Sequence, residues 1–176
     1  ETKFKAEKEL FKIQKKSKLE IIIIRPPLVY GPGVGANFKI LMSIIKKDIP
    51  LPFKNCHNKR SFIFIENLIA FIYQCCINEK AKNQIFTVSD NHDLSITSLI
   101  DKLSFYMNKN IKQFPINIKI IKLFLKILNK EKTYNKLFAS LQIDPTVSYK
   151  KINFTPPYSV DYGLQKTALW YLNNQK

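Results

Sequence analysis

Residues 19–37 read LEIIIIRPPLVYGPGVGAN, and this stretch decides the fold. Its first six residues, LEIIII, are almost entirely apolar, so a strand there would be apolar on both of its faces. Such runs are typical of parallel strands that are covered on both sides. Pro26 and Pro27 follow, and proline ends a strand because it removes a ladder donor and fixes the backbone. We therefore expect a fully buried strand over residues 19–24.

Three of the four glycines of the chain come next, in the run Gly31-Pro32-Gly33-Val34-Gly35. A phosphate cradle, a plain turn and one wall of an active site are the three interpretations of this cluster. The spacing matches neither G-x-G-x-x-G nor the P-loop, which ends in Gly-Lys-Ser/Thr. The pattern favours a turn at the carboxyl end of a buried strand. Ligands bind at that edge of open α/β sheets, so the turn and the active-site wall are compatible.

Strand and helix patterns alternate on either side of this stretch. Residues 60–79, RSFIFIENLIAFIYQCCINE, indicate a strand that runs into a helix, and residues 83–90, NQIFTVSD, indicate another strand. Ser95 is a plausible N-cap for a following helix. Apolar residues at helical spacing predict further helices over residues 2–15, 36–47, 94–108, 116–130 and 159–174. This alternation favours an α/β fold followed by a more helical C-terminal lobe.

Composition limits the classes of function. The 176 residues are 45% hydrophobic, enough for a real core, and no run of about 18 apolar residues predicts a membrane span. The start, ETKFKAEKEL, has no signal-peptide character, and because it lacks Met we expect a piece of a longer chain. Three cysteines without metal-ligand spacing, with Cys75 and Cys76 on different sides of a helix, indicate reduced thiols in a cytoplasmic protein.

The net charge of +16 suggests an acidic partner such as nucleic acid or a membrane surface. However, only Arg25 and Arg60 are arginines and every other basic residue is lysine, which indicates a coding bias that places lysine on solvated faces. The lysine-striped segment 116–130 allows a helix on an acidic membrane, but a helix packed on the core with its lysines solvated is favoured. We expect no nucleic-acid partner.

The histidines offer neither a metal site nor a hydrolase site. His57 lies in KNCHNKR and His92 lies in SDNHD, and neither has a partner at metal or triad spacing. We expect both to be surface loop residues, and we expect no metal. Arg60 stands just before the strand at 61–64, where a guanidinium can form a bidentate pair with a carboxylate or a phosphate. Taken alone, a plain surface arginine is the favoured interpretation, and the scarcity of arginine in this chain weakens it.

Eight segments occur in an order that resembles a known family: ETKFKAEKEL, EIIIIRPPLVYGPG, ANF, IPLPF, RSFIFIENL, NQIFTVSD, LQID and TPPYSVDYGLQKTALWYL. Together they resemble the C-terminal half of extended short-chain dehydrogenase/reductases, in the NAD-dependent epimerase/dehydratase group that acts on nucleotide sugars. The resemblance implies an α/β fold: the C-terminal part of a Rossmann-type parallel sheet plus a smaller, mostly helical substrate-binding lobe. Residues 1–34 would end the Rossmann domain. Residues 35–176 would form mainly the lobe, with a Rossmann strand near 84–90.

The resemblance also implies a catalytic pair, Tyr-x-x-x-Lys, at the start of a long helix. The pattern Thr-Lys-x-x-Ala-Glu places the lysine at Lys3, where it would lower the pKa of the tyrosine and bind the nicotinamide ribose of NAD or NADP. The tyrosine would lie two residues before Glu1, and the glycine-rich dinucleotide loop would lie further upstream. A nearby ammonium stabilises a phenolate, so such a tyrosine ionises nearer neutral pH.

Further roles follow from the same resemblance. The backbone of Pro27, Leu28 and Val29 would lie beside the nicotinamide. Asn37 would contact the sugar or diphosphate, Phe53 would stack on uracil, and Arg60 would clamp the diphosphate. A second phosphate-binding arginine is usual before LQID. No arginine occurs there, and Lys136 is the nearest cation, a departure from a standard UDP-sugar site. Asp144 resembles a structural aspartate.

The function implied is hydride transfer at a sugar carbon by an NAD(P)-dependent nucleotide-sugar epimerase or reductase, with a UDP-linked substrate. This chain would supply the substrate-binding half and would be inactive alone. Family members often dimerise through two long helices, one of which would include residues 1–15, so a homodimer is the expectation. Two alternatives stay open: a basic module that binds nucleic acid or a membrane surface, and a catalytically dead paralogue that keeps the fold.

Overall fold

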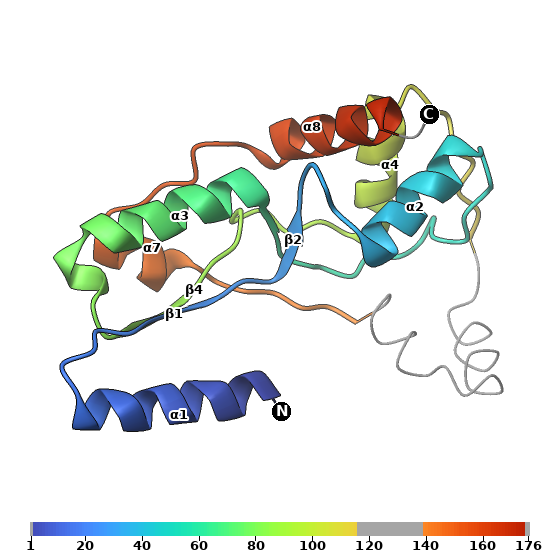
Figure 1. The fold of residues 1–176 in the computed structure, drawn as a ribbon. Helices are drawn as coiled ribbons and strands as arrows, with labels where there is room; N and C mark the ends of the chain where they lie inside the picture. Colours follow the sequence, from blue (N-terminus) through green and yellow to red (C-terminus); the bar gives the residue numbers. More distant parts are fainter. Residues whose placement is uncertain (1, 116–138, 175–176) are drawn as a thin grey trace, which may run out of the picture.

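Two pairs of short parallel strands form the framework of the computed structural model, which describes residues 2–115 and 139–174 (Figure 1). Strand β1 (Ile22–Arg25) pairs with β4 (Gln84–Thr87), with Ile24 opposite Phe86. Strand β2 (Leu28–Tyr30) pairs with β3 (Phe62–Phe64), with Val29 opposite Ile63. Parallel partners require long crossovers, and the β1–β4 crossover includes β2, β3 and two helices. The expected parallel α/β fold is confirmed.

Five helices lie close to their predicted bounds: α1 (Thr2–Lys16), α2 (Ala36–Lys46), α3 (Ile65–Ile77), α4 (Ile96–Tyr106) and α8 (Val160–Asn173). Helix α7 (Thr146–Ile152) and the 3₁₀ turn η1 (Glu79–Ala81) were not predicted. The predicted cap of α4 is confirmed, since Ser95 Oγ accepts a hydrogen bond from Ser98 N at 3.0 Å. The helix predicted over 116–130 lies outside the described residues. Among the described residues, none of the helices has the length and apolar character to cross a bilayer.

The prediction of a fully buried strand over residues 19–24 is wrong in two respects. The strand begins at Ile22, and Leu19 lies ahead of it, half exposed. Ile21 and Ile23 are buried, whereas Ile22 and Ile24 are only partly buried at the margin of a core. The physical reason is that β1 has a single neighbouring strand, β4, within the described residues. Residues 28–30, for which no strand was predicted, form β2.

Helix α1 touches the rest of the molecule through polar contacts. It has no buried residue. Arg25, at the end of β1, donates from Nε and Nη2 to the two carboxylate oxygens of Glu7, at 3.1 and 2.5 Å. Gln14 donates to the side chain of Asn83. Figure 1 shows α1 on one side of the β1–β4 pair and α3 on the other.

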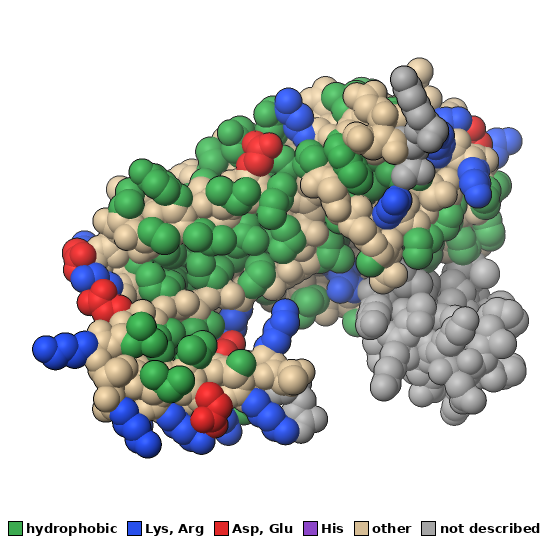
Figure 2. Space-filling model, in the orientation of Figure 1, with side chains coloured by type: hydrophobic (Ala, Val, Ile, Leu, Met, Phe, Trp, Pro, Cys, Tyr) green, Lys and Arg blue, Asp and Glu red, His purple; other side chains and the backbone are tan. Residues whose placement is uncertain are grey.

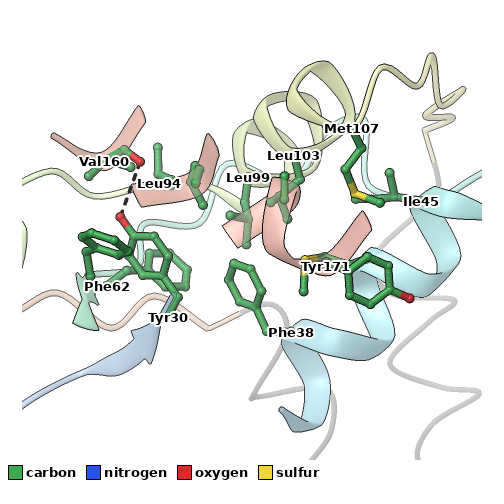
Figure 3. Close-up of a cluster of buried hydrophobic side chains, with 14 residues drawn as sticks. Tyr30, Phe38, Ile45, Phe62, Leu94, Leu99, Leu103, Met107, Val160 and Tyr171 are labelled. Atoms are coloured by element: carbon green, nitrogen blue, oxygen red, sulfur yellow. Dashed lines mark hydrogen bonds between the residues drawn. The ribbon is translucent and has the colours of Figure 1, made fainter. Parts of the chain in front are cut away.

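Strand β3 joins two hydrophobic cores, because successive strand residues point to opposite faces. Phe62 and Phe64 belong to the lobe core, which β2 and β3 form with α2, α4 and α8 (Figure 3). Ile63 belongs to the sheet core, which includes Phe71 from α3 and Phe86 from β4. All three residues of β3 are buried.

The division of the chain into two domains at residue 34 stays a prediction.

Candidate functional site

A pocket of about 490 Å³ opens between α2, the segment around residues 51–53 and the amino-terminal end of α4. Leu28, Asn37, Phe53 and Arg60 all line it, although they come from four separate segments. Most of the remaining wall is apolar, and two of its residues, Ile40 and Ile44, come from α2. The pocket therefore combines a guanidinium, an amide and an aromatic ring inside an apolar enclosure.

The local fold of β2 and α2 explains how Leu28 and Asn37 reach the pocket. Strand alternation directs Val29 to the sheet core and leaves Leu28 on the opposite side, where it forms part of the wall. Asn37 lies in the first turn of α2, where Gly35 is the N-cap and supplies no side-chain cap. Ala36 has φ 49°, a left-handed conformation that costs about 1 kcal/mol for a residue with a Cβ. This strained residue sets the direction in which α2 leaves the glycine turn.

Backbone pairing holds Arg60 in place. Its N–H donates to Leu94 O and its carbonyl accepts from Leu94 N, both at 3.0 Å. On the other side, Ser61 N donates to Leu141 O at 2.9 Å. Among the described residues that line the pocket, Arg60 is the one cation, and no carboxylate lines it. An anionic group bound here would meet a positively charged guanidinium on a fixed backbone.

Phe53 lies on a segment that is tied to neighbouring chain. Leu51 N donates to Lys112 O at 3.1 Å, and Phe114 N donates to Leu51 O at 3.0 Å. The carbonyl of Phe53 accepts hydrogen bonds from Thr97 Oγ1 and from Cys56 N. These contacts fix the backbone that carries the ring, which is the condition for a defined stacking surface.

The other predicted site residues do not line this pocket. Lys3 is exposed in the first turn of α1, Pro27 is partly buried just before β2, and Val29 packs against the sheet core. Lys136 lies outside the described residues. Asp144 accepts a hydrogen bond from Thr146 N at 2.9 Å, and hydrogen bonds from the Thr146 side chain and backbone lower the pKa of the Asp144 carboxyl.

Sequence reasoning missed a polar network centred on Asp90. Its carboxylate accepts hydrogen bonds from Tyr30 OH at 2.8 Å, Asn67 Nδ2 at 2.7 Å and Phe64 N at 3.1 Å. Tyr30 OH also lies 3.4 Å from the carbonyl of Val160, the contact drawn in Figure 3. The network joins β2, β3, α3 and the start of α8. Its sequence signal is weak, since Asp90 looks like an ordinary loop residue in SDNHD.

The pKa shifts of Asp90 and Tyr30 indicate that the role of this network is structural. Burial raises the pKa of the Asp90 carboxyl, and the hydrogen bonds from Asn67, Phe64 and Tyr30 partly offset that rise. Burial, with the charge of Asp90, raises the pKa of the Tyr30 hydroxyl well above its usual range. A phenol in this environment stays protonated at neutral pH, so Tyr30 is a poor acid–base catalyst.

The histidines and cysteines take the places expected of them. His57 and His92 are exposed, and Cys75 is buried while its neighbour Cys76 is exposed. Burial raises the pKa of the Cys75 thiol to about 11, so that thiol is unreactive at neutral pH. Within residues 2–115 and 139–174, no group of three or more His, Cys, Asp or Glu side chains gathers in a way that could hold a metal ion.

Comparison with known proteins gives one strong sequence match. The chain is 40% identical over 172 residues to a UDP-glucose 4-epimerase of Vibrio cholerae. The alignment covers 97% of this chain and 52% of that protein. The chain is homologous to a nucleotide-sugar epimerase. It spans about half the length of the curated relatives it matches. No family model matches the chain.

Solved structures show the same fold. The UDP-glucuronic acid 4-epimerase of Bacillus cereus, in complex with NAD, matches 96% of this chain and 50% of its own, with a TM-score of 0.72 and 17% identity. The UDP-glucose 4-epimerase of Thermotoga maritima, with UDP-glucose, matches 98% of this chain and 52% of its own, with a TM-score of 0.68 and 14% identity. At these identities the likeness establishes the fold alone, which matches the C-terminal portion of the Rossmann-type folds of these two proteins.

Proposed function

We propose that the chain is the substrate-binding half of an NAD(P)-dependent nucleotide-sugar epimerase or reductase, and that the 490 Å³ pocket holds the nucleotide diphosphate of a UDP-linked sugar. One observation carries the proposal. Leu28, Asn37, Phe53 and Arg60, which the family resemblance assigns to substrate and cofactor, meet in one pocket although they are far apart in the sequence. Homology to a UDP-glucose 4-epimerase supports the same substrate class.

The residues of the pocket suit the parts of such a substrate. In the proposed complex the ring of Phe53 stacks on the uracil base. The Arg60 guanidinium donates two hydrogen bonds to the diphosphate, and the Asn37 amide donates to a phosphate or a sugar hydroxyl. The apolar wall excludes water, which strengthens the interaction of Arg60 with the diphosphate.

In the proposed complex, the backbone of residues 27–29 lies beside the nicotinamide end of NAD(P). Of these three residues, Leu28 forms part of the pocket wall. The cofactor, when bound, supplies the hydride acceptor and donor. Lys3 would hold its ammonium near the tyrosine expected two residues before Glu1, stabilising the phenolate. The 176 residues alone would bind substrate without turning it over.

Calorimetry with UDP tests the proposed pocket. Arg60→Ala removes a charge-assisted contact worth about 1.5 to 3 kcal/mol, so UDP should bind roughly tenfold to hundredfold more weakly. Lys59→Ala is the matched control, because Lys59 is exposed, adjacent and absent from the pocket wall. UDP affinity should change by less than about twofold in that variant. Equal losses in the two variants, or no UDP binding by the native chain, would refute the pocket assignment.

Turnover and salt dependence separate the alternatives. A protein that carries this chain together with its tyrosine should convert UDP-glucose in the presence of NAD, whereas a dead paralogue would bind UDP without turnover. A basic binding module would retain DNA or anionic vesicles at low salt and release them at moderate salt. Such retention without UDP binding would replace the epimerase proposal.

A further inference from the structure

Three loops meet at Arg60, and none of them lies in a helix or a regular strand of the described chain. Two loops flank the one that carries Arg60, and each contributes a single paired residue. Leu94 pairs with Arg60 in an antiparallel bridge, and Leu141 pairs with it in a parallel bridge. Pairing this short is marginally stable by itself, so side-chain contacts between the loops add to what holds Arg60.

Asp93 joins all three loops through its side chain. One carboxylate oxygen accepts a hydrogen bond from Ser61 Oγ at 2.5 Å, and the other accepts from Gln142 Nε2 at 2.7 Å. The Ser61 hydroxyl in turn accepts a hydrogen bond from Ile143 N at 2.8 Å. Ser61 is buried and Asp93 is partly buried. The carboxylate of Asp93 therefore links the loop of Arg60 to both of its neighbours.

The third loop also contacts the guanidinium itself, since Arg60 Nη1 donates to the carbonyl of Ala139 at 3.4 Å. Gln142 belongs to the same loop as Ala139, and its hydrogen bond to Asp93 holds that loop. The carboxylate of Asp93 thus acts on Arg60 by two routes. One route is the backbone of Ser61, the next residue in the chain, and the other is the carbonyl of Ala139.

We propose that Asp93 is a positioning residue, which directs the Arg60 guanidinium toward the diphosphate of the substrate. The inference rests on the proposed function, because that function assigns Arg60 to the diphosphate. Asp93 is not among the described residues that line the pocket, so it acts through Arg60 and does not touch the substrate. A binding group is effective when surrounding hydrogen bonds hold it within about 0.5 Å of its productive place.

The direction of the effect separates positioning from simple electrostatics. Removal of the Asp93 carboxylate would make a chain of net charge +16 more positive, and charge alone would then strengthen the binding of an anion. Positioning predicts weaker binding, because the guanidinium loses its fixed geometry. Figure 2 shows Lys and Arg side chains at several separate places on the visible face, so loose attraction of anions is widespread. Measurements in about 0.15 M salt screen that attraction beyond about 8 Å.

Calorimetry with UDP, arranged as a double-mutant cycle on the full chain, tests the proposal. Asp93→Ala should weaken UDP binding roughly fivefold to twentyfold when Arg60 is present, and by less than about twofold in an Arg60→Ala background. Asp161→Ala is the matched control. Its carboxylate also accepts two side-chain hydrogen bonds, from Lys102 and Tyr106, and it is not among the described residues of the pocket wall. UDP affinity should change by less than about twofold in that control.

Two further variants keep the test valid if Asp93→Ala folds poorly. Gln142 is exposed, so Gln142→Ala removes one hydrogen bond to Asp93 without leaving a cavity, and UDP affinity should fall about twofold to fivefold. Asp93→Asn keeps an oxygen that accepts from Ser61 Oγ, so UDP affinity should stay within about threefold of the native value. An Asp93→Asn protein that binds UDP as weakly as Asp93→Ala would contradict positioning by hydrogen bonds.

The cycle distinguishes failure of this inference from failure of the proposed function. If the native chain does not bind UDP, or if Arg60→Ala binds it as tightly as the native chain, the pocket assignment fails and the positioning role fails with it. If Arg60→Ala weakens binding but Asp93→Ala leaves it unchanged or strengthens it, only the positioning role fails. The same holds if Asp93→Ala weakens binding equally with and without Arg60.

Discussion

Gly163 allows α8 to approach β2 and β3 closely, and Gly163→Ala tests whether the lobe core depends on that approach. A Cβ added at Gly163 would lie 2.7 Å from Tyr30 OH and 2.9 Å from two ring carbons of Phe64. Both distances are below 3.0 Å, a separation that real Cβ atoms essentially never show. Either the helix or the two rings must therefore move.

Neither ring has room to move. Tyr30 is 1% exposed and its hydroxyl is hydrogen-bonded to Asp90. Phe64 is fully buried, and its ring packs edge-on against Tyr158 and Tyr162 with centroids 5.9 and 6.1 Å away. Overpacking of a well-filled core costs about 1 to 3 kcal/mol, and these contacts justify the upper end.

Helix propensity acts in the opposite direction. Alanine is favoured over glycine by about 1 kcal/mol in a helix interior, so the net loss in the free energy of unfolding should be about 2 kcal/mol. With a urea m-value of about 2 kcal/mol/M, the unfolding midpoint should fall by about 1 M. Trp170, the single tryptophan of the chain, lies on α8 beside the lobe core and reports the transition by fluorescence.

Gly35→Ala is the control, because a Cβ there meets no atom within 4 Å and should change stability by less than about 1 kcal/mol. A double-mutant cycle with Tyr30→Phe tests whether the added Cβ clashes with the Tyr30 hydroxyl. In a Tyr30→Phe background the hydroxyl is gone, so Gly163→Ala should be less destabilising by about 1 kcal/mol. A Gly163→Ala protein that is as stable as the native chain, or more stable, would refute the close-approach argument.

Four further predictions concern the pocket residues Arg60 and Phe53, the strained Ala36 and the network around Asp90. Arg60→Lys keeps the charge but loses the planar fork, so calorimetry should show UDP affinity reduced roughly fivefold to tenfold. Phe53→Leu should lower UDP affinity by about tenfold through lost stacking while the urea midpoint stays within about 0.3 M, and unchanged affinity would argue against a stacking role. Ala36→Gly should raise the free energy of unfolding by about 0.5 to 1 kcal/mol, because glycine adopts φ 49° without strain. The raised pKa of Asp90 means that the folded state binds this proton more tightly than the unfolded state, so this group lowers stability as pH rises from about 4 towards its folded pKa. Urea midpoints at several pH values should show that Asp90→Asn removes this decline, and identical pH profiles for the two proteins would contradict it.

Part of the candidate site can be predicted from the sequence. Arg60 stands out because it is one of two arginines in a chain whose other cations are lysines. Leu28, Asn37 and Phe53 are identified through the ordered segments that resemble a family, since none of them has a distinctive local pattern. The sequence gives only a weak indication that Ile40 and Ile44 line a pocket. Helix α2 carries apolar residues on more of its surface than a single contact with the core requires.

Neither the hydrogen bonds of Asp90 nor strand β2 can be predicted from local sequence patterns. A loop aspartate is normally exposed, and only the folded chain reveals that Asp90 accepts hydrogen bonds from Tyr30, Asn67 and Phe64. Strand β2 has only three residues, too few to show the alternation of apolar and polar residues that predicts a strand. It also follows two prolines directly, and prolines normally end a strand. Its hydrogen bonds come from β3, more than 30 residues further along the chain.

The sequence by itself determined most of the helices and most of the strands, because their hydrogen bonds and apolar periods are local or repeat along the chain, although α7 was not predicted. α2, the Ser95 cap of α4 and the run from β3 into α3 are of this kind. Only the tertiary structure decided which segments meet. The pocket that joins Leu28, Asn37, Phe53 and Arg60 depends on long-range packing that no local pattern encodes.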